Sequence, residues 1–222
     1  MSLLVFGSTA LDSISTPKKK NPRLLGGSGS HAAVAASFFV SPKLIGVVGT
    51  DFPRKYMTLF KKHKVNLQGV KVREGRTFHW AGEYEVNMNN RRTLSTELGV
   101  VEGYSPVLPA AHRKAKYVLL ANNPPGAQEA IIDQLDKPKF IVADTMDLWM
   151  NVAMNDLRSL LKRVDMLVLD SISPSSFLTV RTKPVVFTCS AGLPCPSSSP
   201  PSAVPMLLSR LPRFLAEILG LL

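Results

Sequence analysis

The sequence contains few cysteines and no long apolar run, and each shortage excludes a class of protein. The two cysteines, Cys189 and Cys195, lack the spacing of a metal site and are too few for a secreted disulfide scaffold. No apolar run approaches the roughly 20 residues of a membrane-spanning helix. The first residues, MSLLVFGSTALDS, have no basic start and only a short apolar run, unlike a signal peptide. A cytoplasmic protein is therefore expected.

Acidic residues are also scarce. The chain has 27 lysines and arginines against 16 aspartates and glutamates, a formal net charge of +11. This charge suits either a polyanionic partner or a substrate that carries phosphates. The basic residues are scattered, and the densest runs lie at 18–20 and 61–64. No aromatic residues are interleaved with these runs, as binding of single-stranded nucleic acid would require. We expect no nucleic acid partner and no membrane partner, and keep a basic adaptor that binds nucleic acid through both runs as an alternative.

Short apolar runs rich in Val, Ile and Leu alternate with helix-like segments over the first 170 residues. Parallel strands have this near-continuous apolar character because helices bury both faces of their sheet. The expected strands are 3–6, 44–48, 117–121, 140–143 and 166–169, and the expected helices are 30–39, 53–62, 126–135 and 155–163. The alternation predicts an α/β layered fold with a mostly parallel central sheet.

Residues 76–100 break this alternation. Phe78, Trp80, Gly82 and Tyr84 alternate with other residues at the period of a half-exposed strand. A Met-Asn-Asn turn follows, and 93–100 returns as a second strand, which predicts a small antiparallel sheet. The sequence leaves open whether this sheet is a surface hairpin or a lid over a binding site.

The composition changes near residue 174. The last 49 residues contain eight prolines, eight serines and a single acid, Glu217. Such segments rarely bury enough apolar surface to offset chain entropy, so we expect 174–199 to lack regular structure. Residues 206–222 could form a short apolar helix. We therefore divide the chain into 1–173 and a Pro/Ser-rich tail, 174–222.

Residues 26–37 read GGSGSHAAVAAS, a glycine turn before a helix of small residues. Such a turn lets a backbone approach a ligand closely and presents the free amides of a helix N-terminus. The glycines lack the spacing of a dinucleotide fingerprint, and no Gly-Lys-Ser/Thr of a Walker loop occurs. A purely structural turn remains the alternative.

The order VFGSTALD, GGSGSHAAVAAS and LIGVVGTDFP resembles the PfkB family of carbohydrate kinases, also called the ribokinase family. Gly46, Val48, Gly49 and Asp51 match the family pattern G-x-V-G-x-D. The later segments YVLLANN, KFIVADTMD and VDMLVLD follow in the family's order, so the resemblance covers about residues 2–170. It implies a ribokinase-like fold with a β lid, a sugar or nucleoside as the small-molecule ligand, and allows for a homodimer.

The resemblance also implies site residues. Asp12 would bind sugar hydroxyls, because a carboxylate accepts two hydroxyl hydrogen bonds in a fixed fork; the alternative is a turn aspartate that caps local amides. Gly26 and Gly27 would bring backbone amides to the sugar. His31 stands where many members have Asn, and could instead pack at the helix start. Asn122 would face the substrate at the end of a strand.

Two aromatic residues, Trp80 and Tyr84, are the lid candidates, which could stack on a ligand or simply pack on the sheet. Asp51 is expected to hold its own loop without touching substrate. The family would use ATP and Mg²⁺ to phosphorylate a sugar hydroxyl.

The family's catalytic motif is missing from these 222 residues. The family carries D-T-x-G-A-G-D, whose glycines hold the transferred phosphate and whose last Asp is the base. No such motif occurs, so we assign no catalytic residue and no metal ligand, and expect the chain as printed to be inactive. A tail read out of frame would explain the loss. A non-catalytic sugar- or nucleoside-binding module of the same fold is the alternative.

Overall fold

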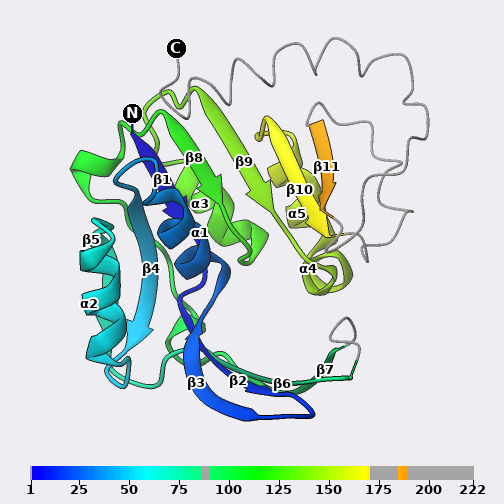
Figure 1. Ribbon diagram of the computed structural model, residues 1–222. Helices are drawn as coiled ribbons and strands as arrows, with labels where there is room; N and C mark the ends of the chain where they lie inside the picture. Colours follow the sequence, from blue (N-terminus) through cyan, green and yellow to red (C-terminus); the bar gives the residue numbers. More distant parts are fainter. Residues whose placement is uncertain (1, 87–90, 171–184, 190–222) are drawn as a thin grey trace.

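Parallel strands form a central sheet in the part of the chain that the computed structural model describes, residues 2–86, 91–170 and 185–189 (Figure 1). The strands are β1 (Leu3–Phe6), β4 (Lys43–Gly49), β5 (Asn66–Arg73), β8 (Tyr117–Leu120), β9 (Phe140–Asp144), β10 (Met166–Asp170) and β11 (Val185–Cys189). Their order is β11-β10-β9-β8-β1-β4-β5, and every neighbouring pair is parallel. The predicted α/β fold with a mostly parallel sheet is confirmed.

Helices cover both faces of this sheet. They are α1 (Ser28–Ala36), α2 (Arg54–Lys62), α3 (Pro125–Ile132), α4 (Asp147–Val152) and α5 (Met154–Leu161). Side chains of successive strand residues point to opposite faces. Accordingly, Val5 packs with Phe60 of α2 on one face, whereas Leu4 and Phe6 pack on the other face with Ile131 of α3. The apolar runs of the sequence are thus continuous because each strand is buried twice.

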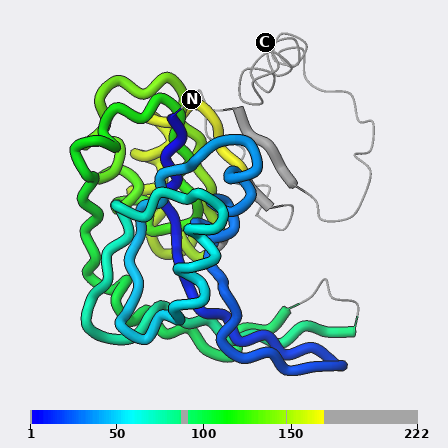
Figure 2. Tube along the Cα trace, turned by 60° about the vertical axis from the view of Figure 1, so that its left-hand side comes forward, coloured from blue at the N-terminus to red at the C-terminus, as the bar shows by residue number. Residues whose placement is uncertain are grey.

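A second, smaller sheet projects from one end of the central sheet (Figure 2). It contains β2 (Ala10–Ser15), β3 (Lys20–Gly26), β6 (His79–Tyr84) and β7 (Arg91–Glu97), in the order β3-β2-β6-β7. The predicted antiparallel pairing within 76–100 is present between β6 and β7. The whole sheet is larger than predicted and mixed, because β2 and β3 also belong to it and β2 pairs with β6 in parallel. We name these four strands the small sheet.

Strand β11 corrects the interpretation of the tail. The prediction that 174–199 lacks regular structure is wrong at Val185–Cys189, which pair residue by residue with β10. Strand β10 is therefore paired on both sides, with β9 and with β11. The run Val-Val-Phe-Thr-Cys has the β-branched and aromatic character of a strand, which the surrounding prolines and serines obscured. The hypothesis that the tail is read out of frame would have to explain how the shifted sequence forms this strand. The proposed helix at 206–222 lies outside the described residues.

Sequence periodicity also did not predict β2, β3, β5 and α4. Strand β5 is the edge of the central sheet, and its residue Val72 is exposed, so its apolar pattern is weak. Helix α4 spans only six residues. No helix in the described part of the chain is both long and apolar enough to cross a membrane.

Candidate functional site

Two glycines allow the turn after β1 to contact the start of α1. A Cβ atom on Gly7 would lie 2.6 Å from the Cα of Gly29, which real Cβ atoms essentially never show. Ser8 then caps the helix. Its carbonyl oxygen accepts hydrogen bonds from the amides of Gly29 (3.0 Å) and Ser30 (3.3 Å), and its hydroxyl accepts one from the amide of Ser28 (3.1 Å).

This capping corrects the interpretation of the glycine-rich stretch. The first amides of α1 were expected to be free for a ligand, but the turn after β1 already satisfies them. Gly27 is required by the turn itself, because its φ is 92° and a Cβ would overlap the carbonyl of Ser8. The sequence analysis did not identify Ser8. The one sequence feature that indicates its role is a small polar residue directly after the glycine that follows a strand.

Asp12 lies on β2 with its carboxylate against Gly26 of β3. A Cβ on Gly26 would overlap that carboxylate, so only glycine leaves room for it. The strand register places Asp12 opposite Trp80 of β6, and residues paired across strands share a face of the sheet. Asp12, Gly26 and Trp80 therefore lie on one face of the small sheet.

Histidines approach this carboxylate from two elements. Burial raises the pKa of the Asp12 carboxyl, and electrostatic interactions with His31 and His79 oppose the rise. His31 belongs to the first turns of α1, so the structure brings together three of the predicted residues, Asp12, Gly26 and His31. His79 was not predicted. Its Nε2 lies 2.8 Å from the Ser13 hydroxyl, and its Nδ1 lies 3.6 Å from Glu97 Oε1.

Asp51 holds its loop, as predicted. Its Oδ1 accepts hydrogen bonds of 2.7 Å from both the amide and the hydroxyl of Thr77, and its Oδ2 accepts one of 2.8 Å from Arg23. Burial acts to raise the pKa of the Asp51 carboxyl, but the hydrogen bonds from Arg23 and Thr77 together with the Arg23 charge hold it below its usual value. The carboxylate thus ties the end of β4 to β3 and to the entry of β6.

Asn122, which follows β8, is held by the protein itself. The indole Nε1 of Trp149 donates to its Oδ1 at 2.7 Å, and its Nδ2 donates to the sulfur of Met146 at 3.0 Å. Since an indole N–H can only donate, these contacts fix which way the amide points. Its Oδ1 is therefore engaged within the protein, and Nδ2 retains a second hydrogen that could meet an acceptor on a ligand. Trp149 had no signal in the sequence, because it lies on the short helix α4.

The aromatic residues of the small sheet have protein contacts of their own. The ring of Trp80 lies against Gly82, where a Cβ would overlap it, and its Nε1 donates to the Thr93 hydroxyl at 3.2 Å. These contacts are those of sheet packing, the alternative role considered for Trp80. Tyr84 ends β6 opposite Arg91.

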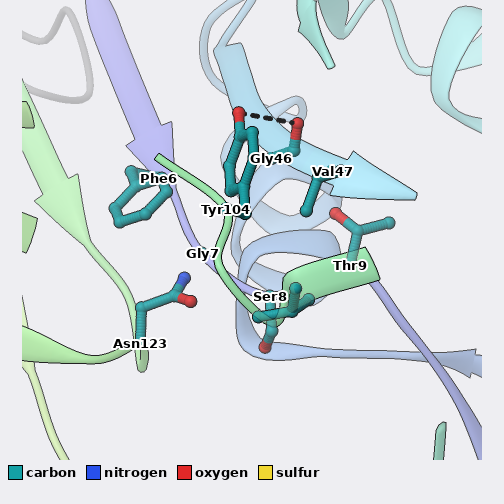
Figure 3. Close-up of a pocket in the computed structure, with 9 residues that line it drawn as sticks. Phe6, Gly7, Ser8, Thr9, Gly46, Val47, Tyr104 and Asn123 are labelled. Atoms are coloured by element: carbon teal, nitrogen blue, oxygen red, sulfur yellow. Dashed lines mark hydrogen bonds between the residues drawn. The ribbon is translucent and has the colours of Figure 1, made fainter. Parts of the chain in front are cut away.

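A small pocket lies beside the turn after β1 (Figure 3). Its lining includes Thr9 and Tyr104, and the Tyr104 hydroxyl donates to the carbonyl of Gly46 at 3.4 Å. The volume in which the centre of a water molecule can lie is about 10 Å³. This volume holds about one water molecule and is too small for a sugar. The hydroxyl of Thr9, a residue only 1% exposed, has no hydrogen-bond partner among the described residues. The pocket therefore has room for a single water molecule.

The described residues contain no group of three or more His, Cys, Asp or Glu side chains that could hold a metal ion. The sequence also lacks the glycine-rich motif that would hold a nucleotide phosphate.

Solved structures share this arrangement of sheets. A nucleoside kinase of Burkholderia thailandensis in complex with inosine superposes with a TM-score of 0.63 at 14% identity, over 77% of this chain and 61% of that one. A nucleoside kinase of Methanocaldococcus jannaschii, described as an archaeal member of the ribokinase family, gives 0.63 at 17% identity over the same shares. A putative ribokinase of Thermoplasma acidophilum gives 0.66 at 15% identity, over 86% of this chain and 70% of that one.

These likenesses identify the class of fold. The chain has the layered α/β fold of ribokinase-like kinases, as the sequence resemblance predicted. No protein-family model and no curated protein matches the sequence. The chain spans about 61% of the length of the two nucleoside kinases.

Proposed function

We propose that this protein is a PfkB-type carbohydrate kinase by descent that binds a sugar or nucleoside over the Asp12 face of the small sheet. The observation that carries the proposal is the half-buried carboxylate of Asp12, for which Gly26 leaves room and beside which His31 lies. Burial removes water from this carboxylate. A ligand with neighbouring hydroxyls would donate the hydrogen bonds that the water no longer supplies. The nucleoside and ribose kinases that share the fold support this class of ligand.

The predicted site residues have separate roles in this proposal. Asp12 accepts two hydroxyl hydrogen bonds, and His31 contributes a donor from the first turns of α1. Asn122 offers the remaining hydrogen of its Nδ2 to an acceptor on the ligand. The small sheet then acts as the lid, with Trp80 and Tyr84 as its aromatic residues.

The reaction of the family would move the γ-phosphoryl group of ATP to a sugar hydroxyl. A ribokinase of Cryptococcus neoformans with the same fold was solved in complex with ADP. The 222 residues printed here contain no D-T-x-G-A-G-D, so no base and no phosphate-holding amides are assigned. We propose that the chain as printed binds its ligand without transferring phosphate, which is also what a non-catalytic binding module would do.

Calorimetric titration of the whole chain with inosine and with ribose tests the ligand site. Saturable binding is expected for at least one of these two ligands. The Asp12→Asn variant should weaken this binding by 10-fold or more, because hydrogen bonds to a charged group contribute about 1.5–3 kcal/mol. Asp136→Asn, the same change at an exposed aspartate of the α3–β9 connection, is the matched control. Unchanged binding in Asp12→Asn would assign Asp12 to local capping instead.

A further inference from the structure

The entire net charge of the chain lies in one segment. Residues 13–73 contain twelve lysines and arginines and a single acid, Asp51, so their formal charge is +11, the same as that of the whole chain. Asp51 is itself paired with Arg23. The other ion pairs of the described residues join side chains outside this segment. The surface built by residues 13–73 therefore carries uncompensated positive charge.

Two phenylalanines interrupt this basic surface. Phe38 and Phe39, just after α1, are 74% and 63% exposed, which is unusual for adjacent aromatic side chains. They are separated in sequence from the basic run at 61–64, so the sequence showed no link between the two.

The fold brings the two groups together at the ends of α1 and α2. The ring of Phe38 meets the ring of His63 edge to face, with centroids 5.5 Å apart at 71°. The hydroxyl of Ser37 lies 3.1 Å from His63 Nδ1. Because His63 stands between Lys62 and Lys64, these contacts place Phe38 beside a run of exposed lysines, and Phe39 is its neighbour in the chain. Lys61, Lys62 and Lys64 have no ion pair within the described residues.

We propose that Phe38, Phe39, Lys61, Lys62 and Lys64 form a docking surface for an anionic lipid membrane, and we name these five residues the aromatic-basic patch. Exposed phenylalanines can enter the headgroup boundary while lysines around them meet anionic headgroups. The cations of the patch are all lysines, which act as compact point charges, whereas arginine predominates in the recognition of nucleic acid. Membrane attraction thus fits this composition better than base stacking. The proposal departs from the expectation, drawn from the sequence, that the protein has no membrane partner.

The location of the patch leaves the proposed ligand site free. Helix α1 begins beside β3 of the small sheet, and α1 and α2 both end on the side that faces away from the small sheet (Figure 1). A membrane bound at the patch would not cover Asp12. The membrane proposal therefore does not depend on the proposed function.

Co-sedimentation of the whole chain with vesicles tests the proposal. Binding is expected to vesicles of phosphatidylcholine with phosphatidylserine, to weaken at high salt and to be absent with phosphatidylcholine alone. Lys61→Glu/Lys62→Glu should reduce the partition coefficient by about fivefold or more per lysine. Phe39→Ser, which leaves the Phe38–His63 contact in place, should reduce it by about 10-fold.

Matched variants at the small sheet separate location from net charge. Lys18→Glu/Lys19→Glu changes the charge equally in the turn between β2 and β3, and Leu94→Ser removes an exposed apolar residue of β7; neither should reduce vesicle binding by more than about twofold. Equal losses in both lysine pairs would overturn the patch as the site. Two other outcomes would overturn the proposal. One is binding to a single-stranded oligonucleotide without binding to anionic vesicles. The other is the absence of vesicle binding by a chain that circular dichroism shows to be folded.

Discussion

Asp51 and Thr77 join the central sheet to the small sheet through one oxygen atom. Asp51 follows β4, whereas Thr77 precedes β6, and Oδ1 of the aspartate accepts both the amide and the hydroxyl hydrogen of the threonine at 2.7 Å. Thr77 is also buried, and its hydroxyl accepts a hydrogen bond from the amide of Gly49 at 2.9 Å. The Asp51 carboxylate is therefore one of the direct links between the two sheets.

Replacement of Asp51 by alanine should lower the free energy of unfolding by about 2–3 kcal/mol at neutral pH, because hydrogen bonds to a charged group are lost. The pKa of Asp51 is lowered in the folded protein, so its contribution is complete above the unfolded value of about 4 and disappears as pH falls through the folded value. Urea unfolding at neutral pH and in acid should show the deficit shrinking. A deficit that is constant with pH would contradict the ionised pairing.

Replacement of Gly26 by alanine should destabilise the protein by about 1–3 kcal/mol and weaken ligand binding, because the new Cβ overlaps the carboxylate of Asp12. Gly126→Ala is the control. That residue lies at the start of α3 with nothing within 4 Å of the added atom, so stability should stay the same or rise by up to about 1 kcal/mol. Thermal unfolding measures both variants, and equal effects would show that Asp12 moves aside freely.

His112 should make the protein less stable in mild acid. The residue is buried, neither ring nitrogen has a partner in the described part of the chain, and burial together with the charge of Lys43 lowers its pKa. The unfolded state therefore takes up the proton first, and stability falls as pH decreases below the unfolded pKa of about 6.5. His112→Leu should flatten this part of the curve in urea unfolding across that range. An unchanged slope would assign the acid sensitivity to other groups.

The 222-residue chain should transfer no phosphoryl group above background. Absence of a general base costs about 10²–10⁴-fold, and each missing donor to the transferred phosphate costs about 10²–10³-fold more. An ATP-consumption assay over a panel of sugars and nucleosides, with calorimetric binding as the parallel readout, tests this. Robust turnover would show that the catalytic groups lie in residues to which we assign no role.

The sequence by itself determined five strands of the central sheet, which are β1, β4, β8, β9 and β10. Runs such as Leu44–Val48 are apolar at every position, and only a strand covered on both faces buries all of them. The amphipathic pattern around Phe60 likewise located α2, with its lysines exposed, to within one residue. These features depend on neighbours in the chain, so local pattern was sufficient.

The tertiary structure alone decided which residues meet. The sequence analysis predicted no strand at β2, and its parallel pairing with β6 joins segments more than 60 residues apart. The same is true of the contact of Asn122 with Trp149, and of Phe38 with His63. No local periodicity encodes such contacts, because they arise only where separate strands and helices converge. For this reason the sequence predicted free amides at the start of α1, whereas in the folded chain Ser8 caps them.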